Sequence, residues 1–430
     1  MPPLTFNQSQ HLYEQGRRLI PGASMTNSKR PSEYAFGAFP IYIESGHGAN
    51  VVDVDGNEYI DYILALGPIT LGYAFDEIDD AVRAQMQKGV LFGLMSPLEV
   101  QAAQEVIDTV PCAEMVRFFK TGAESTTAAL RVARAFTKKD VVLHCGYHGW
   151  LDTISCDREN PGVPQGLNNT LFAFPWNDEN AVKVLLQEHT GKIAAIMVNP
   201  VNYYSVDDGS FLRFLRGVCD EENIVLIYDE IVTGYRLSLG GAQEYFDVIP
   251  DLACFAKGIA NGYPVSALCG RRGVMELCEN LLISSTYGGE TLSLAALIAA
   301  HQVYRDKDVP AVLARQGQKL MDGCNAAARE NNVPAIWEGY PCMSGYRFAY
   351  ESPEMNRHAM TFWLQECASR GVLFRRGGLN FITLSHTDAI IEQTLEVCAK
   401  VLLQLAEAVN KGNLEQQLRT TQAARGRYEQ

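Results

Sequence analysis

The chain has 430 residues, of which 47% are hydrophobic and 20% charged, and its formal net charge is −14 at pH 7. This length and composition are typical of a globular protein with a large core and more than one domain. An acidic surface repels nucleic acid and anionic membranes, so we expect neither as a partner and expect small-molecule chemistry instead.

Eleven cysteines are spread along the chain without a CxxC pair. Most stand among apolar residues, which favours reduced core cysteines of a cytoplasmic protein and disfavours a disulfide framework or a metal site. The N-terminus has no apolar run after a basic start, and no stretch of eighteen apolar residues occurs. We therefore expect neither secretion nor membrane insertion.

The predicted elements begin with a helix at about 8–19. The stretch that follows contains the turn signals ESGHG and DVDGN, which predict a small antiparallel sheet. From about 75 to 305, helical segments alternate with short apolar runs, a pattern typical of a mainly parallel sheet covered by helices on both faces. The predicted strands in this part are 115–119, 141–145, 193–198, 224–231, the run before Lys257, and 265–270.

After Gln302 the pattern predicts a long polar helix, strands at 344–350 and 380–386, and an amphipathic helix near 388–409. The last 18 residues lack an apolar stripe, which predicts a frayed helix or a disordered tail. We expect the two ends of the chain to form one smaller domain. The predicted domain boundaries are therefore 1–70 and 309–430 for the small domain and 71–308 for the large one.

Lys257, in DLACFAKGIANGYP, lies between an apolar run and a loop of small residues. Because lysine is rarely buried without a partner, it could be a surface residue at a strand end. It could also be a nucleophile whose amine is made reactive by desolvation. The stretch alone leaves both interpretations open.

Asp229 follows five apolar residues, at the end of a predicted strand where open α/β sheets bind ligands. A carboxylate there needs a cationic partner or several donors. It could form a salt bridge with Arg236, or it could keep a heterocyclic nitrogen protonated. Asp229 and Lys257 are about one strand crossover apart, which would bring both to the same sheet edge.

Three further motifs stand at element ends. Gly122 and Ala123 precede a helix whose free N–H groups could bind a phosphate, although a glycine before a capped helix is common. Tyr147 could stack on a flat ring or pack in the core. Thr286 precedes an apolar helix, where its hydroxyl could donate a hydrogen bond to a phosphate or could be part of a simple helix cap. Together with a lysine and a carboxylate, these groups match the requirements of pyridoxal phosphate (PLP).

The motifs TGAES, GYHGW, YDEIVTGYR, FAKGIANGYP and STYGGETLSLAA resemble the class III PLP-dependent aminotransferases of fold type I, over about residues 10–410. The resemblance implies an α/β fold with a large domain, in which a mainly parallel seven-stranded sheet lies between helices, plus a smaller α+β domain from both termini. It also implies that Lys257 binds the cofactor covalently and moves a proton, and that Asp229 binds its ring nitrogen.

The same resemblance implies that Tyr147 and Ile231 cover the two ring faces, and that Gly122 and Ala123 donate backbone N–H groups to the phosphate. Thr286 would reach the phosphate of a second subunit, which implies a homodimer. The family usually has a hydroxyl residue in place of Ala123, so Ser125 is an alternative source of that hydrogen bond.

Within the family the chain resembles the glutamate-1-semialdehyde aminomutase group, through LIPGAS, VVDVDGNEYIDY and GPITLG. It departs from that group at Ala65 and Leu66, where the aminomutase has Ser-Trp, and at Asn199, where a glutamate is usual. GYHGW, NPGVPQG, FPWND and GGETLSLAA are more similar to sugar aminotransferases, among them the enzyme that makes 8-amino-3,8-dideoxyoctulosonate for lipopolysaccharide. Arg30 stands near the position of a substrate-carboxylate arginine, or is a solvated turn residue.

The sequence therefore predicts a cytoplasmic, homodimeric aminotransferase that transfers an amino group from an amino acid, L-glutamate, to an aldehyde or keto sugar. One alternative is glutamate-1-semialdehyde 2,1-aminomutase. An alternative of another class is a catalytically silent PLP-binding regulatory protein, against which the chain shows no basic helix-turn-helix extension.

Overall fold

A computed structural model describes residues 4–158 and 160–420. Its largest element is a seven-stranded sheet in the order β4-β10-β9-β8-β7-β5-β6, in which β10 is antiparallel to both neighbours and the other pairings are parallel. The strands are β4 (Met115–Phe119), β5 (Val141–Cys145), β6 (Leu171–Ala173), β7 (Ile193–Val198), β8 (Val225–Asp229), β9 (Leu252–Phe255) and β10 (Ser266–Gly270).

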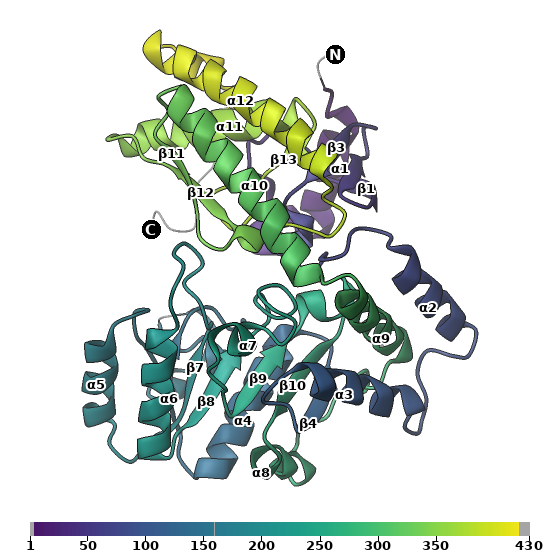
Figure 1. Ribbon diagram of the computed structural model, residues 1–430, viewed down its shortest axis with the longest axis vertical. Coiled ribbons are helices and arrows are strands. Elements are labelled where there is room, and N and C mark those ends of the chain that lie inside the picture. Colours follow the sequence, from purple (N-terminus) through teal and green to yellow (C-terminus); the bar gives the residue numbers. More distant parts are fainter. Residues whose placement is uncertain (1–3, 159, 421–430) are drawn as a thin grey trace.

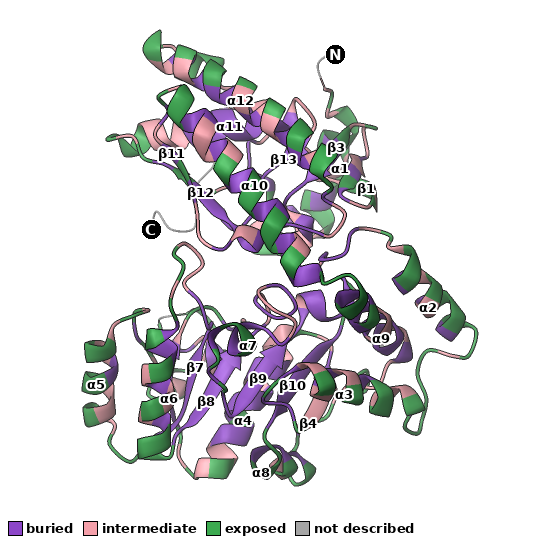
Figure 2. Ribbon diagram, viewed as in Figure 1, coloured by how far each residue is buried: buried purple, intermediate pink, exposed green. Residues whose placement is uncertain are grey.

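The predicted mainly parallel sheet is confirmed; the sequence pattern missed only the three-residue edge strand β6. Every residue of the four central strands β7 to β10 is buried, because helices cover both faces of the sheet. Figures 1 and 2 show these buried strands in the lower part of the molecule, among its helices. These helices are α2 (Asp76–Met86), α3 (Pro97–Thr109), α4 (Gly122–Thr137), α5 (Glu179–Glu188), α6 (Ser210–Glu222), α7 (Ala242–Phe246), α8 (Arg272–Met275) and α9 (Thr291–Asp306).

The two ends of the chain meet in the upper part of Figure 1. There β13, from the C-terminal third, pairs in parallel with β3 of the predicted antiparallel sheet β1-β2-β3. The boundaries at residues 70 and 308 stay a prediction. The elements of this part are α1 (Asn7–Leu19), β1 (Ile43–His47), β2 (Asn50–Asp53), β3 (Glu58–Asp61), α10 (Val309–Glu330), β11 (Ala335–Glu338), β12 (Gly345–Phe348), α11 (Pro353–Ala368), β13 (Val372–Leu373) and α12 (Asp388–Asn410).

The prediction of a strand at 380–386 is wrong. This segment forms no ladder and turns at residues 384–385, and its N–H groups donate to carbonyls of three separate segments. The bonds run from Asn380 to Ser344, from Phe381 to Tyr62 and from Leu384 to Thr70. The segment thus ties distant parts of the chain together beside the candidate active site.

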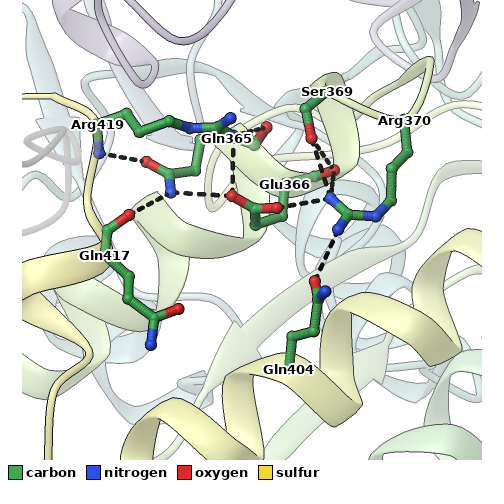
Figure 3. Close-up of polar contacts among 7 residues, drawn as sticks. All are labelled: Gln365, Glu366, Ser369, Arg370, Gln404, Gln417 and Arg419. Atoms are coloured by element: carbon green, nitrogen blue, oxygen red, sulfur yellow. Dashed lines mark hydrogen bonds and ion pairs between the residues drawn. The ribbon is translucent and has the colours of Figure 1, made fainter. Parts of the chain in front are cut away.

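The C-terminal segment also differs from its prediction. Residues 413–420 pack against α11, with the Arg419 guanidinium 2.8 Å from the Glu366 carboxylate, and Gln365 bonds to the backbone of both Gln417 and Arg419 (Figure 3). Leu414 is buried in the core. The rest of the predicted tail, residues 421–430, lies outside the described residues. Across the described chain no helix is both long and apolar enough to cross a bilayer.

Candidate active site

The carboxyl ends of the parallel strands β5, β7, β8 and β9 open into a cavity of about 830 Å³. Open α/β sheets bind ligands at this edge. The cavity brings together six of the residues that were predicted to hold the cofactor: Gly122, Ala123, Tyr147, Asp229, Ile231 and Lys257. They come from the ends of three strands, β5, β8 and β9, and from one helix N-terminus, so their meeting is a property of the fold.

Lys257 begins the turn that follows β9 and has a φ of +47°, in the left-handed region that lysine seldom adopts. Burial lowers the pKa of its amine to about 8; the charges of Arg236 and Arg375 act in the same direction, and the Asp229 charge opposes them. A lysine with a lowered pKa has more neutral, nucleophilic amine near neutral pH. This environment favours the interpretation of Lys257 as a nucleophile.

Asp229 is the last residue of β8 and is buried. Its Oδ1 accepts the N–H of Ile231 at 3.2 Å, and its Oδ2 lies 2.8 Å from Nδ1 of His148. The possible salt bridge with Arg236 is absent, because that guanidinium donates to the backbone carbonyls of Gly67, Val232 and Ile382. The Asp229 carboxylate can therefore serve a protonated ring nitrogen in the cavity.

The N-terminus of α4 forms another part of the wall. Thr121 caps the helix by accepting the N–H of Glu124, which leaves the N–H groups of Gly122 and Ala123 outside the helical hydrogen bonding. A Cβ on Gly122 would stand 2.5 Å from Cδ1 of Ile231, so only glycine fits there. Backbone N–H groups at a helix N-terminus bind phosphate well. Ser125 is a poor alternative donor, since it does not line the cavity and bonds to the Gly122 carbonyl.

Tyr147 presents a largely exposed ring to the cavity, 71% of the residue being accessible. Its N–H donates to Oδ1 of Asn199 at 3.1 Å. The preceding Gly146 has a φ of +112°, and a Cβ there would lie 2.1 Å from the same oxygen. Asn199 therefore fixes the backbone that carries Tyr147, and the stacking of this ring on the cofactor stays a prediction.

Two of the predicted site residues do not line this cavity. Thr286 is exposed in the segment before α9, and its predicted contact with a second subunit stays a prediction. Arg30 is exposed, and its guanidinium lies beside Gly22, although its neighbours 25–28 do line the cavity. A role for Arg30 in binding substrate also stays a prediction.

Several charged or titratable residues that line the cavity were not predicted from the sequence, among them Lys120, His148 and Arg375. His148, the partner of Asp229, stands next to Tyr147 in GYHGW, so a search for a second donor to that carboxylate could have found it. Arg375 lines the cavity from the segment after β13, far along the chain. No local pattern marks Arg375, because only the tertiary fold brings it to Lys257.

The wall opposite the sheet contains a strained turn. Leu64, Ala65 and Leu66 have φ values of +44°, +53° and +73°, and Leu66 lines the cavity. Such backbone conformations cost about 1–3 kcal/mol each and persist only where the surroundings impose them. The buried Arg236, which donates to the Gly67 carbonyl, is one such constraint. A leucine here occupies less space than the tryptophan that the sequence resemblance implies for the aminomutase.

Comparison with known proteins agrees with this geometry. The aminotransferase class-III family model matches residues 33–405. A 3-aminobutyryl-CoA aminotransferase of Cloacimonas acidaminovorans is 32% identical, over 94% of this chain and 98% of that protein. A glutamate-1-semialdehyde 2,1-aminomutase of Acetivibrio thermocellus is 36% identical, over 91% of this chain and 97% of that protein.

Among solved structures, the PLP-bound FumI protein of Sphingopyxis sp. MTA144 superposes with a TM-score of 0.88 at 25% identity, over 94% of this chain and 98% of that one. The lysine, the carboxylate and the helix N-terminus described above fit PLP at its aldehyde, ring nitrogen and phosphate. The chain belongs to the class III aminotransferases and is a PLP-dependent enzyme of fold type I.

Proposed function

We propose that this aminotransferase moves an amino group from L-glutamate to the carbonyl of an acidic sugar. The specific candidate is an 8-oxo-octulosonate, which would give 8-amino-3,8-dideoxyoctulosonate for lipopolysaccharide. Such an acceptor has a carboxylate and several hydroxyl groups. The single observation that supports this proposal is the polar wall of the cavity, where Arg375 accompanies Thr26, Asn27 and Ser28.

Arg375 is suited to bind a carboxylate from either substrate. It is half-buried in the cavity wall and forms no ion pair within residues 4–158 and 160–420. A guanidinium can bind a carboxylate through two parallel hydrogen bonds, which fixes orientation as well as affinity. The neighbouring hydroxyl and amide side chains can bond to sugar hydroxyls. We therefore expect acceptors without a carboxylate to react poorly.

The residues of the sheet edge would carry out the proton transfers common to both half-reactions. PLP supplies an electron sink for the substrate carbon when it is bound. Lys257 would bind the cofactor at rest and, once a donor amine replaces it, move a proton between the substrate carbon and the cofactor carbon. Asp229 would keep the ring nitrogen protonated, while Tyr147 and Ile231 would restrict the ring to one plane.

The proposal includes a homodimer. The segment 90–95 exposes several large apolar side chains, among them Leu94 at 81% and Met95 at 82%. An exposed apolar patch favours an interface with another chain. Thr286 is likewise exposed and does not line the cavity of its own subunit. Both properties are required for its predicted contact with the phosphate of a second subunit.

The second candidate function is glutamate-1-semialdehyde 2,1-aminomutase. The 36% identity of a relative with that name favours it, and Leu66 in place of the aminomutase tryptophan opposes it. A panel of carbonyl acceptors separates the two, with acidic eight-carbon sugars, a 3-oxoacyl-CoA and glutamate semialdehyde compared by kcat/KM. The sugar proposal fails if glutamate semialdehyde is isomerised without a donor and no sugar is aminated.

A further inference from the structure

Three more titratable side chains lie in a row behind Asp229: His148, His144 and Asp157. Nδ1 of His148 is 2.8 Å from Oδ2 of Asp229. The His144 ring stands edge-on to the His148 ring, with centroids 5.6 Å apart and planes at 69°. Nε2 of His144 lies 3.5 Å from Oδ2 of Asp157. All four side chains are buried, and the row ends at the exposed Arg158, 3.0 Å from Asp157.

Stability alone does not explain His144. It lies in the otherwise apolar strand β5, and among the described residues neither of its ring nitrogens, nor Nε2 of His148, has a hydrogen-bond partner. An unsatisfied buried polar group costs about 1–3 kcal/mol, a cost that a leucine of similar volume would avoid. A residue that is unfavourable for folding at the back of an active site points to a role in that site.

The neighbours of His144 can define its protonation state and its tautomer. Burial lowers the pKa of His144 to about 4, with the charge of His148 acting in the same direction and that of Asp157 opposing it, so His144 is neutral at physiological pH. The nearby carboxylate of Asp157 favours the tautomer with the proton on Nε2. His144 then presents a fixed ring edge to His148.

His148 is constrained from both sides as a result. Its backbone carbonyl accepts the hydroxyl of Thr126 at 2.7 Å, and its ring lies between His144 and Asp229. Because the ring cannot turn over freely, Nδ1–H stays directed at Oδ2 of Asp229. A second-layer partner that fixes tautomer and ring orientation in this way is common at metal sites, and the same physics applies to a carboxylate.

We propose that His144 and Asp157 are positioning residues for the cofactor. They keep Nδ1–H of His148 on Asp229, and so fix the orientation of the carboxylate that meets the PLP ring nitrogen. This role is independent of the acceptor, since every half-reaction uses the same ring nitrogen.

The experiment compares His144→Leu, His144→Gln and Asp157→Asn with the unchanged holoenzyme. The first readout is the downfield proton resonance of the His148 Nδ1–H, identified by its loss in His148→Gln. The second is the dissociation constant of PLP. In His144→Leu and Asp157→Asn we expect the resonance to broaden or move, and PLP to bind about threefold to tenfold more weakly, the range that one hydrogen bond contributes. His144→Gln, which keeps a polar N–H group at this position, should restore most of both signals.

Two controls separate positioning from general destabilisation. His386→Leu removes another fully buried histidine, in the part of the chain near α12, and Arg158→Ala removes the exposed partner of Asp157. Both should leave the resonance and the PLP affinity unchanged. If His144→Leu does not fold, Asp157→Asn at the surface end of the row decides the question. An unchanged resonance together with PLP affinity within twofold of the original in a folded variant would overturn the proposal.

Discussion

The two walls of the active-site cavity are built in different ways. The wall on the side of the sheet, here called the cofactor wall, consists of strand ends and a helix N-terminus. Its central carboxylate, Asp229, is only 2% exposed. The opposite wall, here called the loop wall, consists of turns and loops, and its Met25 is 86% exposed. Fixed backbone and fixed charges suit chemistry that every family member shares. Adaptable loops suit the choice of substrate.

The largest effect should come from Lys257→Ala, which removes the proposed nucleophile and proton carrier of the cofactor wall. We expect kcat to fall by at least about a thousandfold, since acid–base and covalent contributions are lost together. The visible absorbance of the lysine-bound cofactor should disappear. Lys139→Ala, at a half-buried lysine that does not line the cavity, is the control. Turnover within tenfold of the original enzyme would show that another group does this work.

Asp229→Asn should have the next largest effect. The amide cannot stabilise a protonated ring nitrogen by charge, so PLP should bind about tenfold to a hundredfold more weakly, as for a lost hydrogen bond to a charged group. Equilibrium dialysis of the cofactor measures this directly. Affinity equal to that of the original enzyme would mean that Asp229 does not meet the ring.

Arg375→Met tests the opposite wall. We expect KM for carboxylate substrates to rise about tenfold or more, because the bond between a half-buried guanidinium and a carboxylate contributes about as much as a hydrogen bond to a charged group. The affinity for PLP should change little. Arg30→Met is the matched comparison, and its guanidinium lies beside Gly22. If Arg30→Met raises KM and Arg375→Met does not, the predicted role of Arg30 is correct and that of Arg375 is wrong.

The pKa of Lys257, which belongs to the cofactor wall, depends on the charge of Arg375 on the opposite wall. The folded-state pKa of about 8 is below the ordinary 10.5, so the amine loses its proton, and becomes reactive, as the pH rises through about 8. The rate at which the cofactor-free enzyme captures PLP should follow this rise. Arg375→Met removes one positive charge that lowers the pKa, so its curve should move to higher pH. A shift to lower pH would contradict the electrostatic explanation.

Leu66→Trp should have the smallest effect on the chemistry. Filling the space on the loop wall should lower kcat/KM for a large sugar acceptor about tenfold, in line with the loss of apolar pocket space, and leave PLP affinity unchanged. Leu66→Met controls for substitution within the strained turn. Equal losses for large and small acceptors would indicate a damaged turn rather than a filled pocket.

The cofactor wall could be predicted from the sequence better than the opposite wall. The cofactor wall was predictable because each residue stands at the end of a strand or helix that its own neighbours define, as Asp229 does after β8. Arg375 was not, since a loop position depends on the packing of segments far apart in the chain. The strand predicted at 380–386 is wrong for a related reason: the N–H groups of this segment bond to three different segments instead of to one neighbouring strand.

The most direct measurement of the central claim is a single half-reaction. The PLP-loaded enzyme is mixed with L-glutamate in the absence of any acceptor, and 2-oxoglutarate and the cofactor spectrum are followed together. An aminotransferase that uses glutamate should release about one 2-oxoglutarate per active site and convert its cofactor to the amine form, and Lys257→Ala should do neither at a comparable rate. Absence of 2-oxoglutarate with glutamate and with a panel of other amino donors, from an enzyme fully loaded with PLP, would contradict an aminotransferase with an external donor.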